Sequence, residues 1–203
     1  TGKRVRATFR KVEAESVCPA NQRSFLHGRS RMNIHVVTER SVGEKKVYRH
    51  WIPLVNPALI YVDHVSEIEN NNYSIITGGG YPNYFDIIEN AIEDVNAACN
   101  IDRLVIAVDS EEMTCEEKKS EIHEFISKLS CQADVRIIIQ HFCLETWALG
   151  NQKLISHKPK SERLRSYMRL YNVRNNDPEL LPPHSQETLN REQFEEKYLK
   201  AAL

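Results

Sequence analysis

Several features that mark other protein classes are missing from this 203-residue sequence. No apolar run approaches the roughly 18 residues of a membrane-spanning helix, and no leader-like apolar stretch lies near the start. These absences predict a protein without membrane contact. An excess of charge of one sign is also missing, since the net charge is −1. A nucleic-acid partner would therefore have to bind a local basic patch.

The cysteines do not form a recognisable disulfide or metal-binding pattern. There are five, an odd number, and none forms a Cys-x-x-Cys pair. Such usage is typical of reduced thiols, which predicts a cytoplasmic location.

The composition changes sharply at about residue 32. Residues 1–31 contain eight Lys or Arg but only two acids, and they show no helical or strand period. They are either an extension outside the natural domain or a basic arm that binds nucleic acid or a partner. The sequence therefore predicts three parts: a basic extension over residues 1–31, an α/β domain over 32–155, and a C-terminal helical segment over 156–203.

Apolar strands alternate with helical patterns in the middle part. Strands are predicted at residues 33–37, 73–77, 104–108 and 135–139. Helices are predicted at about 41–55, after the glycine turn at 78–80, at 114–129 and at about 144–155. In the first of these helices the apolar residues Val42, Val47, Trp51 and Leu54 fall on related turns, which predicts a buried stripe. This alternation predicts an α/β fold with a mainly parallel sheet and helices on both faces. Residues 58–68 fit either a short strand or an insert.

Two helices are predicted in the tail. The first, over residues 160–174, carries Arg163, Arg165 and Arg169, which either track a phosphate backbone or form a solvated face. The second begins with a cap at Ser185 or Thr188. This last helix either packs back on the domain or holds a partner subunit, such as a second copy of the chain.

Carboxylates follow two of the predicted strands directly. Asp109 and Glu111 follow the strand at 104–108, and Glu39 follows the strand at 33–37. Because functional groups collect beyond the carboxyl ends of parallel strands, these acids are expected to lie together. Clustered carboxylates resist joint ionisation unless a cation lies among them. Oxygen ligands favour Mg²⁺ or Mn²⁺, which suits phosphodiester cleavage. In the alternative interpretation, Asp109 only caps the next helix.

The order of these motifs resembles the TOPRIM domain of topoisomerases, primases and OLD-type nucleases. The similarity covers roughly residues 32–155. It rests on Glu39 after the first strand, on Asp109-Ser110-Glu111 after the third, and on the glycine turn "TGGGYPNYFDII". The segment "IIIQHFCLETWALG" is similar to a segment of RloB-like defence proteins, and the glycine turn resembles that of OLD-type nucleases, so the resemblance points to OLD- and RloB-like nucleases.

This resemblance implies a divalent-metal-dependent nuclease that acts on DNA or RNA as a toxic effector of bacterial anti-phage defence. Glu39, Asp109 and Glu111 would be the catalytic metal ligands, with Glu44 and Glu145 as further ligands of Mg²⁺ or Mn²⁺. A regulatory ATPase is the partner implied by analogy. The alternative is a catalytically inactive TOPRIM-like scaffold that binds a partner protein or nucleic acid.

Two further expectations concern the same domain. Gly79 and Gly80 either present backbone N–H groups to a nucleic-acid phosphate or form a merely permissive turn. Trp147 is expected in the core.

Overall fold

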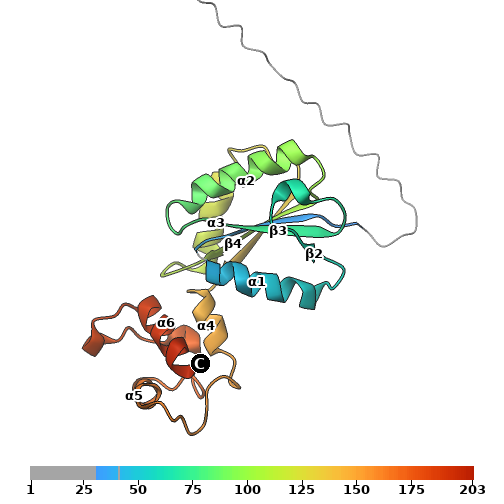
Figure 1. The fold of residues 1–203 in the computed structure, drawn as a ribbon. Helices are drawn as coiled ribbons and strands as arrows, with labels where there is room; N and C mark the ends of the chain where they lie inside the picture. The colour runs from blue at the N-terminus through green and yellow to red at the C-terminus, as the bar shows by residue number, and fades with distance from the viewer. Residues whose placement is uncertain (1–30, 41) are drawn as a thin grey trace, which may run out of the picture. The chain divides into compact units, whose positions relative to one another are not determined.

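Five parallel strands form the centre of the fold (Figure 1). β1 (Ile34–Thr38) lies between β3 (Asn72–Thr77) and β4 (Arg103–Asp109), while β2 (Ile60–Tyr61) and β5 (Asp134–Gln140) form the edges. All four neighbouring pairs are parallel, which confirms the predicted α/β class. This computed structural model describes residues 31–40 and 42–203. The predicted basic extension lies outside them, except for Arg31.

Helices cover both faces of the sheet. α2 (Tyr84–Ala98) and α3 (Cys115–Ile126) pack on one face, in a cluster that contains Val37 and Ile106. α1 (Val42–Val55) packs on the other face. Because neighbouring strand residues point to opposite faces, β1 contributes Val37 to the first cluster and Val36 to the second. All five residues of β1 are buried, as expected of a central parallel strand.

The buried face of α1 differs from the predicted one. Tyr48 and Ile52 pack against the sheet. Trp51 and Leu54, which were expected on the buried stripe, are 40% and 80% exposed. The apolar residues of this helix extend around more than one face, so periodicity alone misplaced the core-facing stripe.

The C-terminal segment has a core of its own. It contains α4 (Leu144–Leu149), α5 (Glu162–Leu170), α6 (Arg191–Ala202) and two short 3₁₀ helices at Pro178–Leu180 and Ser185–Glu187. Leu149, Tyr167 and Phe194 are among its buried residues. α4 therefore contributes to this second core, although the sequence grouped it with the α/β domain.

The last helix begins later than predicted. Asn190 caps α6, because its side chain accepts a hydrogen bond from the N–H of Gln193. Thr188 instead adopts a left-handed conformation with φ of 55°, which ends the preceding turn. Neither Ser185 nor Thr188 is thus the cap of α6. α6 packs back against α4 of the same chain.

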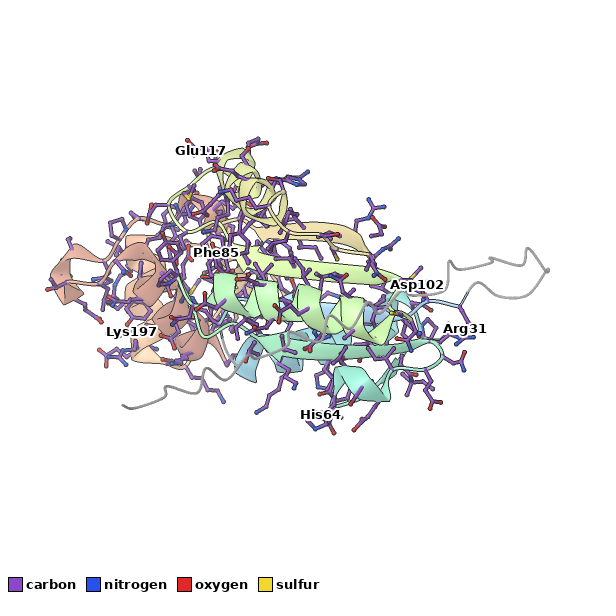
Figure 2. All side chains as sticks on the ribbon, turned by 90° about the horizontal axis from the view of Figure 1, so that it is seen from above. Arg31, His64, Phe85, Asp102, Glu117 and Lys197 are labelled. Atoms are coloured by element: carbon purple, nitrogen blue, oxygen red, sulfur yellow. The ribbon has the colours of Figure 1, made fainter. Side chains whose placement is uncertain are left out.

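The strands place their carboxyl ends beside the C-terminal helices. Arg31 and Asp102 lie at the amino ends of β1 and β4, and Lys197 of α6 lies beyond the opposite end of the sheet (Figure 2). No helix in residues 31–40 and 42–203 is both long and apolar enough to cross a membrane. Cys115, Cys131 and Cys143 are free thiols.

Candidate functional site

The candidate site lies where the strand order reverses. β2 and β3 lie on one side of β1, and β4 and β5 lie on the other. In open parallel sheets, the connections diverge at such a point and leave room for a ligand beyond the carboxyl ends of the strands. Glu39 follows β1, and Asp109 is the last residue of β4. The sheet topology therefore brings the two acids to neighbouring strand ends, as predicted.

Glu39 is fully buried and contacts Asp109 directly. Its Oε2 accepts a hydrogen bond of 2.8 Å from the backbone N–H of Asp109. Its Oε1 is buried without a hydrogen-bond partner. Burial raises the pKa of Glu39 above its usual range, although the Asp109 hydrogen bond opposes the shift. Glu39 Oε2 thus links the ends of β1 and β4, while Oε1 is left without a hydrogen-bond partner.

Asp109 has the more perturbed carboxyl group. Only 1% of the residue is exposed, and its Oδ1 is also buried without a partner. Burial raises the pKa of Asp109 to about 9, and the nearby charges of Glu44 and Glu39 add to the increase. The charge of Arg40 opposes it. Functional sites often contain a buried acid of this kind, whose pKa is raised by burial and by neighbouring negative charges.

Two other predicted acids lie close to this pair. Glu44 is 5% exposed in the first turn of α1, where its Oε2 accepts a 2.9 Å hydrogen bond from the N–H of Arg40. Glu145 lies in the first turn of α4, and its charge also raises the pKa of Asp109. The helices that flank the strand ends therefore each add a carboxylate to the site.

Arg40 pairs with three acids and was not predicted as a site residue. Its guanidinium lies 4.0 Å from Asp109 and 3.1 Å from Glu111, and it also pairs with Glu192 of α6. Glu111 has a left-handed backbone with φ of 51°, and 42% of its side chain is exposed. Glu111 thus turns toward Arg40 at the rim of the site.

The predicted metal triad is not assembled as a closed ligand set. Among residues 31–40 and 42–203, no three His, Cys, Asp or Glu side chains form a group that could hold a metal ion. Glu39 and Asp109 are together, while Glu111 is engaged by Arg40. The assignment of these three residues as metal ligands stays a prediction.

A third strand end contributes an unsatisfied polar group. Gln140 ends β5, pairs in register with Asp109 and is fully buried. Neither polar atom of its amide has a hydrogen-bond partner. Since buried polar atoms usually find partners, orphan atoms on Glu39, Asp109 and Gln140 at three adjacent strand ends favour a polar ligand here.

The glycine turn at residues 78–80 contacts the backbone of Glu39. Gly80 donates its backbone N–H to the carbonyl oxygen of Glu39 at 2.8 Å, so this N–H is engaged within the protein. Gly79 and Gly80 have φ of 73° and 86°, which glycine adopts easily. A β-carbon on Gly78 would lie 3.0 Å from the carbonyl oxygen of Glu39. The turn thus positions Glu39, and its contact with a phosphate stays a prediction.

Lys118 is a buried cation that sequence reasoning missed. It is 2% exposed in α3, and its Nζ lies 3.0 Å from Glu121. Burial alone would lower the pKa of Lys118, but hydrogen bonds to Tyr84 and Glu121 leave it raised, so the side chain stays charged. Its charge lowers the pKa of Glu39. Its burial could have been predicted from the sequence, because Lys118 lies four residues before Ile122 and therefore on the same face of α3.

Ser110 and His141 form a pair that could suggest nucleophilic catalysis. Ser110 Oγ lies 3.1 Å from His141 Nδ1 and also accepts a 2.8 Å hydrogen bond from the N–H of Phe142. Ser110 is fully buried. It therefore joins the turns after β4 and β5 instead of presenting a nucleophile.

The other predicted residues lie in the C-terminal segment. Arg163, Arg165 and Arg169 are exposed on α5, and their role as a phosphate track stays a prediction. Trp147 is 39% exposed, so its expected place in the core is wrong. The short helix α4 buries Thr146 and Leu149, which leaves Trp147 on the outer side.

The raised pKa of Asp109 predicts a specific dependence of stability on pH. Between its ordinary value of 3.8 and about 9, the folded protein keeps a proton that the unfolded chain has lost. The contribution of Asp109 to stability is therefore complete below the lower value, and it falls by up to about 1.4 kcal/mol per pH unit as the pH rises to the upper one. Urea unfolding of the wild type and Asp109→Asn, without metal, should show this slope only in the wild type. Parallel pH profiles would contradict it.

Searches against models of protein families, curated proteins and solved structures give no match for this chain.

Proposed function

We propose that this protein is a divalent-metal-dependent phosphodiesterase whose substrate is a nucleic acid. The observation that carries the proposal is the pair of buried carboxylates at adjacent strand ends, Glu39 and Asp109, each with one oxygen that lacks a hydrogen-bond partner. Burial of such groups is costly unless something pairs with them. A cation bound between them would remove this cost.

The chemistry of these residues suits Mg²⁺ or Mn²⁺. All candidate ligands are oxygen donors, which hard divalent cations prefer. Glu39 and Asp109 would hold the ion, with Glu111, Glu44 and Glu145 as the surrounding acids. When bound, such an ion activates water and neutralises charge on the reacting phosphate.

Two basic residues support a phosphate substrate. Arg40 offers a guanidinium at the rim, and guanidinium groups bind phosphate oxygens in a bidentate manner. Lys118 keeps a positive charge that acts on Glu39 and lowers its pKa. Binding of a phosphodiester would draw Arg40 away from Glu111, which would free the third predicted acid.

The resemblance to TOPRIM nucleases of the OLD and RloB type extends this proposal. It supports a toxic effector of bacterial anti-phage defence that acts in the cytoplasm and is restrained by a regulatory ATPase. The motifs quoted above carry this extension, and the pair of buried acids does not depend on it.

A second candidate function is a non-catalytic scaffold that binds a partner. It is favoured by the internal pairing of Arg40, which already neutralises part of the acid cluster through Asp109, Glu111 and Glu192. Such a protein would need no divalent cation.

Assays of metal binding and cleavage distinguish the two functions. The purified protein should bind Mn²⁺ with saturation in calorimetry. It should also cleave at least one of three substrates, namely single-stranded DNA, duplex DNA and RNA, in Mn²⁺ but not in EDTA. Because the ligands must lose protons to bind metal, Mn²⁺ affinity should rise as the pH increases toward about 9. A protein without saturable Mn²⁺ binding and without cleavage would be the scaffold.

A further inference from the structure

The chain exposes its two tryptophans as a stacked pair. Trp51 of α1 and Trp147 of α4 are its only tryptophans. Their ring centroids lie 6.5 Å apart with an interplanar angle of 16°. The residues are 40% and 39% exposed, so a substantial part of both rings faces solvent. Large aromatic side chains are usually well buried, and an exposed pair commonly marks a contact site.

The tryptophan pair is connected to the carboxylates through α1. Glu44, Tyr48 and Trp51 follow at spacings of four and three residues, which places them on one face of the helix. Tyr48 is buried, and its ring packs edge-on against Trp51 at 6.0 Å. Burial raises the pKa of Tyr48, and the charges of Glu44 and Asp109 raise it further. Tyr48 thus lies between the acid pair and the tryptophans.

A basic cavity follows α4 closely along the chain. It is a depression open to solvent, with a volume of about 600 Å³, and it begins at Gln152, three residues after α4 ends. Its basic lining residues are Lys153, His157, Lys158 and Arg174, and no acid lines it. Arg174 holds the cavity wall in place, since its Nη1 donates to the carbonyl oxygens of Gln152 and Ile155. In a protein of net charge −1, this lining gathers basic side chains in one place.

We propose that Trp51 and Trp147 bind an unpaired base of a single-stranded nucleic acid by stacking, and that the basic cavity after α4 receives phosphates of the same strand. The inference rests on the proposed function and names its substrate class. In a duplex the base faces are already stacked on their neighbours, whereas in a single strand they are free for aromatic side chains. The combination of exposed rings with a basic groove is typical of proteins that bind single strands. A protein partner would be favoured by the exposed rings but not by the basic cavity.

Tryptophan fluorescence gives a direct test. Because both tryptophans belong to the pair, oligo(dT) or oligo(U) of about 12 nucleotides, added to the full chain in EDTA, should quench the intrinsic fluorescence with saturation. A blunt duplex of the same length should bind more weakly. Anisotropy of a labelled strand then measures the affinity of variants that melt like the wild type. Trp51→Leu and Trp147→Leu should each weaken binding by about tenfold. Lys153→Gln should reduce the dependence of affinity on salt.

The control is Leu54→Ala, which removes an exposed aliphatic side chain from the next turn of α1 without touching a ring. Base stacking predicts no change in this variant. The proposal is overturned if the tryptophan variants bind like the wild type, if the duplex binds as tightly as the single strand, or if no quenching occurs. Binding that depends on the tryptophans without any cleavage in Mn²⁺ would support this site and reject the proposed catalysis. Cleavage in Mn²⁺ together with unaltered binding in the tryptophan variants would support the proposed catalysis and reject this binding site.

Discussion

Asp109→Ala is expected to abolish metal-dependent cleavage and to leave the metal-free protein as stable as the wild type or more so. Asp109 is buried at the end of β4 beside Glu39 and Glu44, where burial and the charges of these two acids oppose its ionisation. Its removal relieves the cost of burying and protonating this acid, which function requires but folding does not. The loss of a metal ligand should lower the cleavage rate by at least about a thousandfold, since bound metal supplies several kcal/mol of charge stabilisation. Thermal melts without metal and cleavage assays in Mn²⁺ measure the two effects.

The matched control is Ile106→Ala, three residues earlier in the same strand. Ile106 is fully buried in the core between the sheet, α2 and α3. This change should cost about 2–5 kcal/mol of stability, because it leaves a cavity, yet it does not alter the acids. Its cleavage should survive at temperatures where the variant is folded. Cleavage by a folded Asp109→Ala protein would refute the catalytic assignment.

Gly78→Ala should destabilise the protein strongly. A β-carbon at this position would lie 2.6 Å from the Cβ and 2.8 Å from the Cα of Tyr84. Tyr84 begins α2 and is fully buried, so that it cannot move away cheaply. We expect a loss of about 3 kcal/mol in the free energy of unfolding, as for an overpacked core. Cleavage should also fall, because the turn holds the backbone of Glu39. Urea denaturation measures the first effect.

The neighbouring glycine offers a comparison. A β-carbon on Gly79 would have no atom within 4 Å, although φ is 73°. Asparagine tolerates this left-handed conformation, so Gly79→Asn should cost less than about 1 kcal/mol. Equal losses in the two variants would show that close packing at Gly78 is not the cause.

The sheet could be predicted because its central strands are continuous apolar runs. β1, β3, β4 and β5 all lie within a residue or two of their predicted places. The sequence around β2 fits either a strand or an insert, because β2 has only two residues and Ile60 is 63% exposed, so that no apolar pattern marks it. The start of α6 was misplaced because Ser185 and Asn190 are both good caps, and tertiary contacts decide between them.

Only those residues of the candidate site could be predicted whose positions follow from the order of the strands in the sheet. Glu39 and Asp109 come together because parallel neighbours end at the same edge of the sheet. The position of Arg40 depends on Glu192, which lies about 150 residues later, and no local pattern encodes that pairing. Trp147 was misassigned because large apolar residues are usually in the core.

The pairing of Arg40 with Glu192 has a consequence for the C-terminal helix. One guanidinium contacts both Asp109 of the sheet and Glu192 of α6, so the attachment of α6 and the proton on Asp109 share a single counter-charge. Thermodynamic reciprocity then applies: if release of α6 changes the proton affinity of Asp109 by some factor, loss of that proton must change the docking constant of α6 by the same factor. Ionisation of Asp109 at the sheet edge and docking of the last helix are in this sense linked through Arg40.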